Sequence, residues 1–197
     1  YAYILFMILF IFNFIETIHI SSKTITQNYF LLFILTISLL IPLLMIPSSN
    51  PLLKHFILIL WLVSFAIILY PLKLRLEEKS SSDIQNLMLI FIFLILSASL
   101  LTLIVPSQFL YGLSLPLFIG LLGLIFAQII DVLLGSHNNK TISSIAVVLF
   151  TIFISYDTHL AIEASKYCKE NKADYIQYSM GLFLDFINLF SSLDNTS

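Results

Sequence analysis

Long apolar runs separated by short polar stretches dominate this chain of 197 residues. A helix that crosses a bilayer needs about 20 mostly apolar residues, because each residue adds about 1.5 Å and the hydrocarbon core is about 30 Å thick. Seven runs are long enough, and each ends at a proline or at a polar stretch. They cover residues 1–20, 29–47, 53–72, 87–105, 109–134, 142–163 and 175–193.

The connections between these runs are too short to hold a soluble domain. Backbone N–H and C=O groups find no partners in lipid, so spanning segments are helices or closed barrels, and continuous rather than alternating apolarity favours helices. The sequence therefore predicts an all-α integral membrane protein, a bundle of seven transmembrane helices that forms one domain over residues 1–197.

Polar and small residues near the run ends give finer predictions. In the polar stretch 73–86, Ser82, Asp83 and Asn86 are candidate N-caps for the fourth run. Pro116 either kinks the fifth run or marks its true start. Small residues at helix-packing spacing either bring two helices close together or face lipid by chance, and they are Ser97 with Ala98, and Gly120 with Gly123 and Ala127.

The composition supports a membrane protein and argues against several other classes. Hydrophobic residues make up 59% of the chain and charged residues 10%, with a mean hydropathy of +1.03. A soluble domain carries about 25% charged residues, so soluble enzymes and nucleic-acid-binding domains fit poorly. The net charge of −2 offers no basic patch for nucleic acid, and a single cysteine, Cys168, cannot form an internal disulfide. We expect the lipid bilayer as a partner and no nucleic acid.

The basic residues do not decide the orientation in the membrane. Of the nine lysines and arginines, five are assigned to the connections after the odd-numbered runs, Arg75 among them, and four to the others, Lys54 among them. Such an even split gives no direction under the positive-inside rule. The chain begins at Tyr1 rather than Met, which leaves residues upstream open. We expect its first run to be a span rather than a signal peptide.

Four acidic residues fall inside the predicted spans, where ionised groups are costly and usually functional. Glu16 and Asp131 lie near span ends, and snorkelling to the interface explains them. Asp157 and Asp185 lie deeper, with no lysine or arginine in either span. Such carboxyls must be protonated, share a proton with each other, or bind a cation. The alternative is two separately protonated aspartates that help helices pack.

Polar neighbours of these two aspartates are candidate supporting residues. Asn188 follows Asp185 at i+3 on the same helix face, within reach of that carboxyl. His159 lies on a polar stripe of the sixth run, on a different face from Asp157. Among the side chains, histidine has the ordinary pKa that lies nearest to neutral pH. No second histidine or cysteine lies at ligand spacing, so the sequence predicts no metal site of that type.

The segments YDTHLAI (156–162) and DYIQYSMGLFLDFINLF (174–190) resemble the signature of the Bax inhibitor-1 family, also called transmembrane Bax inhibitor motif proteins. The matching positions are Asp157, Thr158, Asp174, Tyr175, Ile176, Asp185, Asn188 and Phe190. The resemblance implies a seven-helix bundle with a central last helix. It also implies a pH-sensitive calcium leak in which Asp157 and Asp185 share a proton, Thr158 and His159 being part of the motif. Calcium would then be the transported ion.

Two departures from the family pattern stand out. Bacterial members use an arginine in the second helix as a latch to one aspartate, but residues 29–47 contain no basic residue. The glutamine of the family motif is His159 here.

Two functions therefore compete at the level of sequence. The first is the calcium or cation leak. The second is a non-conducting accessory subunit of a larger complex in an intracellular membrane, either the mitochondrial inner membrane or the endoplasmic reticulum. An intramembrane hydrolase also needs paired aspartates, but the glycine-rich context of such sites is missing, and no cofactor-binding or nucleophile motif occurs. We expect no enzyme activity and no cofactor.

Overall fold

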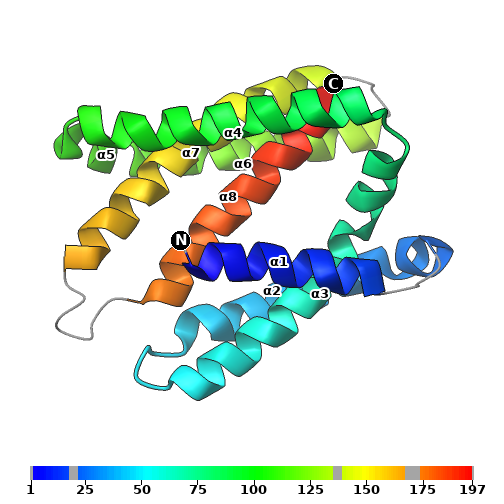
Figure 1. The fold of residues 1–197 in the computed structure, drawn as a ribbon, viewed down its shortest axis with the longest axis horizontal. Coiled ribbons are helices and arrows are strands. Elements are labelled where there is room, and N and C mark those ends of the chain that lie inside the picture. Colours follow the sequence, from blue (N-terminus) through cyan, green and yellow to red (C-terminus); the bar gives the residue numbers. More distant parts are fainter. Residues whose placement is uncertain (1, 18–21, 135–138, 167–173, 197) are drawn as a thin grey trace. The chain divides into compact units, whose positions relative to one another are not determined.

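The computed structural model of the chain describes residues 2–17, 22–134, 139–166 and 174–196. Over these residues the chain is helical, without strands. The elements in chain order are α1 (Ala2–Thr17), α2 (Ser22–Met45), α3 (Pro51–Glu77), α4 (Ser81–Ile104), α5 (Ser107–Gly112), α6 (Ser114–Leu134), α7 (Asn139–Lys166) and α8 (Tyr175–Thr196) (Figure 1). The prediction of an all-helical membrane protein is confirmed.

Five of these helices are long and apolar enough to cross a membrane. Their spanning segments are Gln27–Met45, Pro51–Glu77, Ser81–Ile104, Ser114–Asp131 and Lys140–Lys166. α1 is apolar but has 16 residues, about 24 Å of helix, which is shorter than the hydrocarbon core. α8 has the length but carries more polar residues, Asp185 and Asp194 among them. Seven spans therefore stay a prediction.

The predicted fifth run, 109–134, is divided between two helices. α5 ends at Gly112 and α6 begins at Ser114. Pro116 has no N–H, so it cannot donate to the carbonyl of Gly112 one turn earlier, and a continuous helix would lose that bond. At the start of α6 the missing donor costs nothing, because the first N–H groups of a helix have no intrahelical partner. Pro116 thus marks the start of a helix, as one of the two predictions had it, although α6 begins two residues earlier, at Ser114.

The two ends of α3 and the start of α4 differ from the sequence prediction. Arg75, assigned to a connection, lies in the last turn of α3. Lys54, also assigned to a connection, lies in its first turn and is buried. The N-cap of α4 is Ser80, whose Oγ accepts the N–H of Asp83 at 3.2 Å and donates to its carboxylate at 2.7 Å. The predicted caps Ser82, Asp83 and Asn86 therefore lie inside α4.

The described chain divides into two compact units. The first contains α1, α2, α3 and residues 175–180 of α8, and the second contains α4 to α7 and the rest of α8. The prediction of a single domain stays a prediction.

In the first unit, α3 packs against both α1 and α2. α1 buries one residue per turn toward it: Ile4, Met7, Ile11 and Ile15. A polar contact joins the same two helices, because the Tyr3 hydroxyl lies 3.0 Å from Nε2 of His55. His55 Nδ1 lies 2.6 Å from the carbonyl of Pro51, which can only accept. The proton of the neutral imidazole is therefore on Nδ1, and Nε2 accepts from Tyr3.

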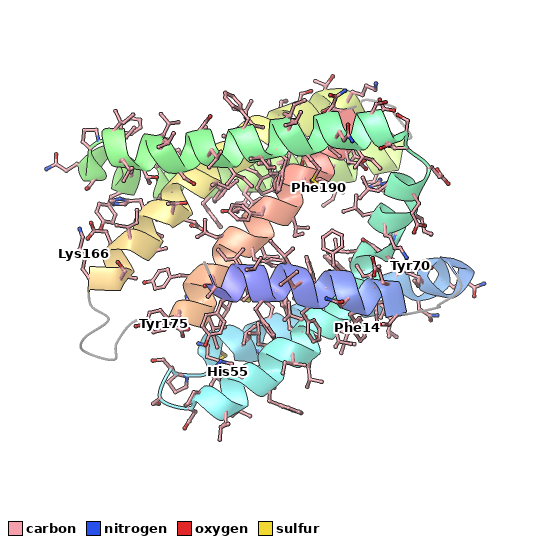
Figure 2. The ribbon with its side chains drawn as sticks, in the orientation of Figure 1. Phe14, His55, Tyr70, Lys166, Tyr175 and Phe190 are labelled. Atoms are coloured by element: carbon pink, nitrogen blue, oxygen red, sulfur yellow. The ribbon has the colours of Figure 1, made fainter. Side chains whose placement is uncertain are left out.

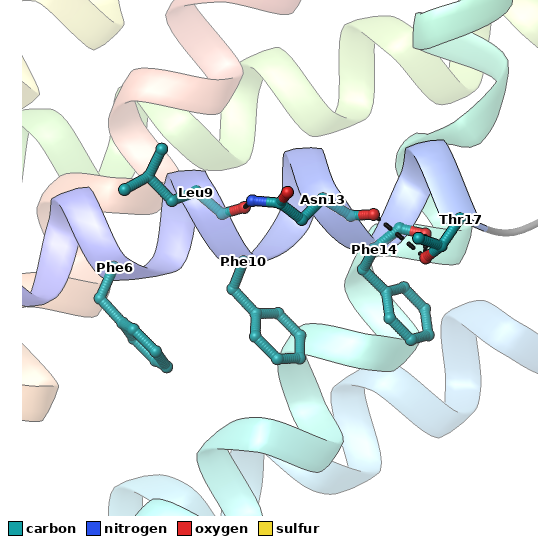
Figure 3. A pocket seen from close by; sticks show the side chains of 6 residues that line it. All are labelled: Phe6, Leu9, Phe10, Asn13, Phe14 and Thr17. Carbon is teal, nitrogen blue, oxygen red and sulfur yellow. Dashed lines mark hydrogen bonds between the residues drawn. The ribbon is translucent and has the colours of Figure 1, made fainter.

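Another face of α1 carries a shallow apolar pocket, lined by Phe6, Leu9, Phe10, Asn13, Phe14 and Thr17 (Figure 3). The Asn13 amide donates to the carbonyl of Leu9 at 2.8 Å. The Thr17 hydroxyl donates to the carbonyl of Phe14 at 2.9 Å. Both polar side chains thus donate to carbonyls of their own helix, which lowers the cost of placing this face against hydrocarbon.

In the second unit, α7 packs against α4, α5 and α6 (Figure 1). Ala98 of α4 is fully buried, and the Ser155 hydroxyl of α7 donates to its carbonyl at 2.9 Å. Gly120 of α6 faces Leu149 of α7, since a Cβ added there would meet Leu149 Cδ1 at 2.9 Å. The small-residue prediction is thus confirmed for Ala98 and Gly120, whereas Gly123 faces open space.

Enlarging Ala98 should loosen the contact between α4 and α7. Ala98→Leu is expected to lower the free energy of unfolding in mixed micelles by about 1–3 kcal/mol, because the larger side chain overpacks a closed interface. Ala2→Leu makes the same change at an exposed position of α1 and should shift that free energy by less than about 0.5 kcal/mol. Equal losses in the two variants would contradict the close contact at Ala98.

Candidate functional site

Asp157 of α7 and Asp185 of α8 lie together in the second unit, with their carboxyl groups within hydrogen-bonding reach of each other. Asp185 is 7% exposed, and Asp157 is partly buried. Two ionised carboxylates are both acceptors, so this contact becomes a hydrogen bond only when one of them carries a proton. Without that proton, Oδ2 of Asp185 is buried and has no hydrogen-bond partner among the described residues. The geometry therefore suits a pair that shares one proton.

Gly181 brings the two helices close enough for this contact. It lies one turn before Asp185 on the same face of α8. A Cβ added at Gly181 would lie 2.5 Å from Oδ2 of Asp157, closer than real Cβ contacts come. The Asp157 carboxyl thus rests against bare backbone, in space that a side chain at position 181 would occupy.

A phenylalanine of α4 packs against two phenylalanines in the next two turns of α8. Phe91 of α4 makes edge contacts with Phe186 and Phe190, with ring centroids 6.4 Å and 5.3 Å apart. Phe190 is labelled in Figure 2. Phe183 is fully buried. These contacts pack α4 against the turns of α8 that follow Asp185.

The remaining predicted site residues fall in different places. Thr158 and His159 are buried in α7 at 3% and 4% exposure. The ring of His159 packs edge-on against Tyr111 of α5, with centroids 5.0 Å apart. Two residues of helix rotation turn His159 away from Asp157. Asn188 is exposed, so its side chain does not join Asp185 in the buried site.

The two acidic residues near the ends of predicted spans also differ. Glu16 is exposed, as snorkelling requires. Asp131 is 7% exposed and has interactions inside the protein. Snorkelling therefore stays a prediction for Glu16 and is wrong for Asp131.

No group of three or more histidine, cysteine, aspartate or glutamate side chains that could hold a metal ion occurs within the described parts of the chain. Calcium takes six to eight oxygen ligands, and two carboxylates supply at most four. Calcium binding at Asp157 and Asp185 therefore stays a prediction, in which other ligands would have to complete the shell.

Sequence reasoning missed Gly181 and Phe91. The signal for Gly181 was present, because a glycine four residues before a buried aspartate lies on the same helix face and marks a close approach. Phe91 gave no such signal, since many phenylalanines of this chain lie on exposed helix faces.

Adding one methyl group at Gly181 should separate the two carboxyls. Gly181→Ala is expected to weaken the infrared carbonyl band of the proton-sharing pair. It should also lower the free energy of unfolding by about 1–3 kcal/mol, because the new Cβ overlaps Asp157. Gly123→Ala is the matched control, since nothing lies within 4 Å of that position. It should leave the band unchanged and stabilise α6 by about 0.5–1 kcal/mol. Equal effects of the two substitutions would contradict the close approach at Gly181.

Comparison with known proteins places this geometry in a family context. A family model described as inhibitor of apoptosis-promoting Bax1 matches residues 1–195. The match extends well beyond residues 156–190, which carry the resemblance seen in the sequence.

Two bacterial proteins are similar over shorter segments. An uncharacterized membrane protein of Vibrio cholerae is 33% identical over 78 residues, which are 39% of this chain and 32% of that protein. An uncharacterized protein of Campylobacter jejuni is 36% identical over 80 residues, 40% of this chain and 32% of that protein. The aligned segments thus span about a third of each relative. No solved structure matches the chain significantly. The family match covers nearly the whole chain, and the chain therefore belongs to the Bax inhibitor family of membrane proteins.

Proposed function

We propose that this protein is a pH-sensitive leak for calcium or other cations, with Asp157 and Asp185 as the proton-sensing pair. The observation that carries the proposal is the meeting of two carboxyls from α7 and α8 in a partly buried place, within hydrogen-bonding reach. Membership of the Bax inhibitor family supports it. Thr158, next to Asp157 on α7 and buried, would act as a supporting residue, whereas His159 and Asn188 lie outside the contact of the pair.

The chemistry of the proposed sensor follows from one proton. While the pair shares it, one carboxyl donates to the other and the two helices attract at this point. When it leaves, two like charges remain close together where Asp185 is buried and Asp157 partly buried. At a separation of 4 Å and an effective dielectric constant of 20, they repel by about 4 kcal/mol. Loss of the proton therefore favours separation of α7 and α8, so flux rises as pH increases.

The same charges would favour a cation over an anion. Deprotonation turns the pair from a neutral or singly charged site into one with two negative charges, which attract a divalent cation most strongly. Because the oxygen ligands are too few for tight binding, the ion would pass on instead of staying. Calcium is thus cargo in this proposal.

Flux through proteoliposomes tests the leak. Proteoliposomes that contain the wild-type protein should release calcium faster as pH rises. Asp157→Asn and Asp185→Asn should hold flux low at every pH, because an amide can donate permanently to the remaining carboxylate. Glu16→Gln neutralises an exposed carboxyl of α1 and should leave the pH profile unchanged. Absence of flux at every pH, or an unaltered profile in both aspartate variants, would refute the leak.

The second candidate is a non-conducting accessory subunit of a larger membrane complex. The observation that favours it is the extent of large exposed side chains on α4 and α6, which another helix could cover as well as lipid. Under this proposal the complex lies in an intracellular membrane, either the mitochondrial inner membrane or the endoplasmic reticulum.

Purification in mild detergent separates the two functions. An accessory subunit should elute together with other membrane proteins in a large assembly, and its proteoliposomes should show no flux. Elution of the chain alone, with pH-dependent flux, would contradict the accessory role.

A further inference from the structure

A buried ion pair joins α3 to the start of α8 in the first unit. Lys54 is 1% exposed, and its ammonium pairs with Oδ2 of Asp174. Figure 2 labels their sequence neighbours, His55 on α3 and Tyr175 at the first residue of α8. The lysine also donates to the carbonyl of Ile46 at 2.9 Å. A charged group this deeply buried needs such partners, because water cannot solvate it.

The Asp174 carboxylate holds α8 as well as Lys54. While Oδ2 pairs with the lysine, Oδ1 accepts the backbone N–H of Gln177 at 3.1 Å. The carbonyl of Asp174 accepts the N–H of Tyr178 at 3.2 Å, the first backbone bond of the helix. Asp174 is thus the N-cap of α8, and one side chain links this cap to α3.

The position of Lys54 is unfavourable for α3 alone. A lysine in the first turn of a helix faces the positive end of the helix dipole, where acidic residues are preferred. Its ammonium instead compensates the negative end of α2, where the carbonyl of Ile46 follows the last helical residue, and it pairs with the carboxylate that caps α8. Lys54 therefore serves the junction of three helices rather than the helix that carries it.

We propose that the Lys54–Asp174 pair anchors the first turn of α8 to α3, and that this anchor acts on the Asp185 carboxyl carried by the same helix. Asp185 is eleven residues after Asp174, about 16 Å along one continuous helix. Lys54 and Asp174 are positioning residues under this proposal, because neither touches Asp157 or the transported ion. The link to Asp185 rests on the proposed sensor, whereas the tether itself rests on the contacts at Lys54.

Hydrogen exchange of residues 175–180 in the full-length protein tests the tether. Asp174→Asn keeps an N-cap oxygen for Gln177 but removes the charge, and Lys54→Met removes the partner charge. Each should speed exchange by about tenfold or more, because Asp174→Asn leaves the buried Lys54 ammonium unpaired and Lys54→Met leaves the partly buried Asp174 carboxylate without its cation. The double variant leaves neither charge unpaired, so its exchange should be no faster than that of either single variant. Lys54→Arg keeps the charge and should exchange at a rate near that of wild type. It takes the place of Lys54→Met in the test if that variant folds poorly.

Lys73→Met is the matched control, because it breaks an exposed pair with Glu77 on the same helix and makes the same charge change. It should leave exchange in α8 unchanged. Equal acceleration by Lys73→Met, or additive effects in the double variant, would overturn the tether.

The link to Asp185 is tested by the pH at which the infrared carbonyl band of the shared proton disappears. Asp174→Asn and Lys54→Met should shift this pH, and Lys54→Arg should leave it at the wild-type value. Faster exchange with an unshifted band would limit the pair to a structural role and overturn the positioning of Asp185. A band missing from wild type at every pH would count against the proposed sensor and the link, while the exchange rates would still decide the tether.

Discussion

Hydrocarbon offers no hydrogen-bond partners, so every polar atom inside a span must find one within the protein, and the rest of this structure follows from that constraint. Most hydroxyls in the spans meet it locally. Thr36, Ser38 and Thr151 each donate to the carbonyl one turn earlier on their own helix. Ser155 instead donates across to the carbonyl of Ala98 on α4, and this bond joins α4 to α7. Local bonding leaves helix faces free for lipid, whereas bonding across helices fixes how they pack.

α8 differs from the other long helices because two carboxyl groups make its main polar contacts with neighbouring helices. Its first turn is capped by Asp174, whose partner is the Lys54 ammonium. Its middle carries Asp185, whose partner is another acid, so that contact depends on a proton. In the proposed sensor, the first contact would keep α8 in place while the second responds to pH.

The helical fold could be predicted from the sequence because length and apolarity are local properties. The Asp157–Asp185 pair was also predictable, since charges without nearby cations stand out in such apolar spans. Lys54 and Arg75 were not, because a basic residue near a run end resembles a connection until its partner is known. The partner of Lys54 is 120 residues away, and no local pattern reveals it. The division between α5 and α6 depended on one missing donor at Pro116.

The bare backbone at Gly181 has a consequence for how sequences of this kind can drift. Leucine, isoleucine and phenylalanine on lipid-facing surfaces can replace one another at little cost, so overall identity says little about whether a relative still holds the carboxyl pair. Glycine is the one amino acid without a Cβ, and the atom that a Cβ would strike is the Asp157 oxygen itself. A relative with both aspartates but a larger residue at this position would keep the acids and lose their contact, which makes this glycine a better diagnostic than the aspartates alone.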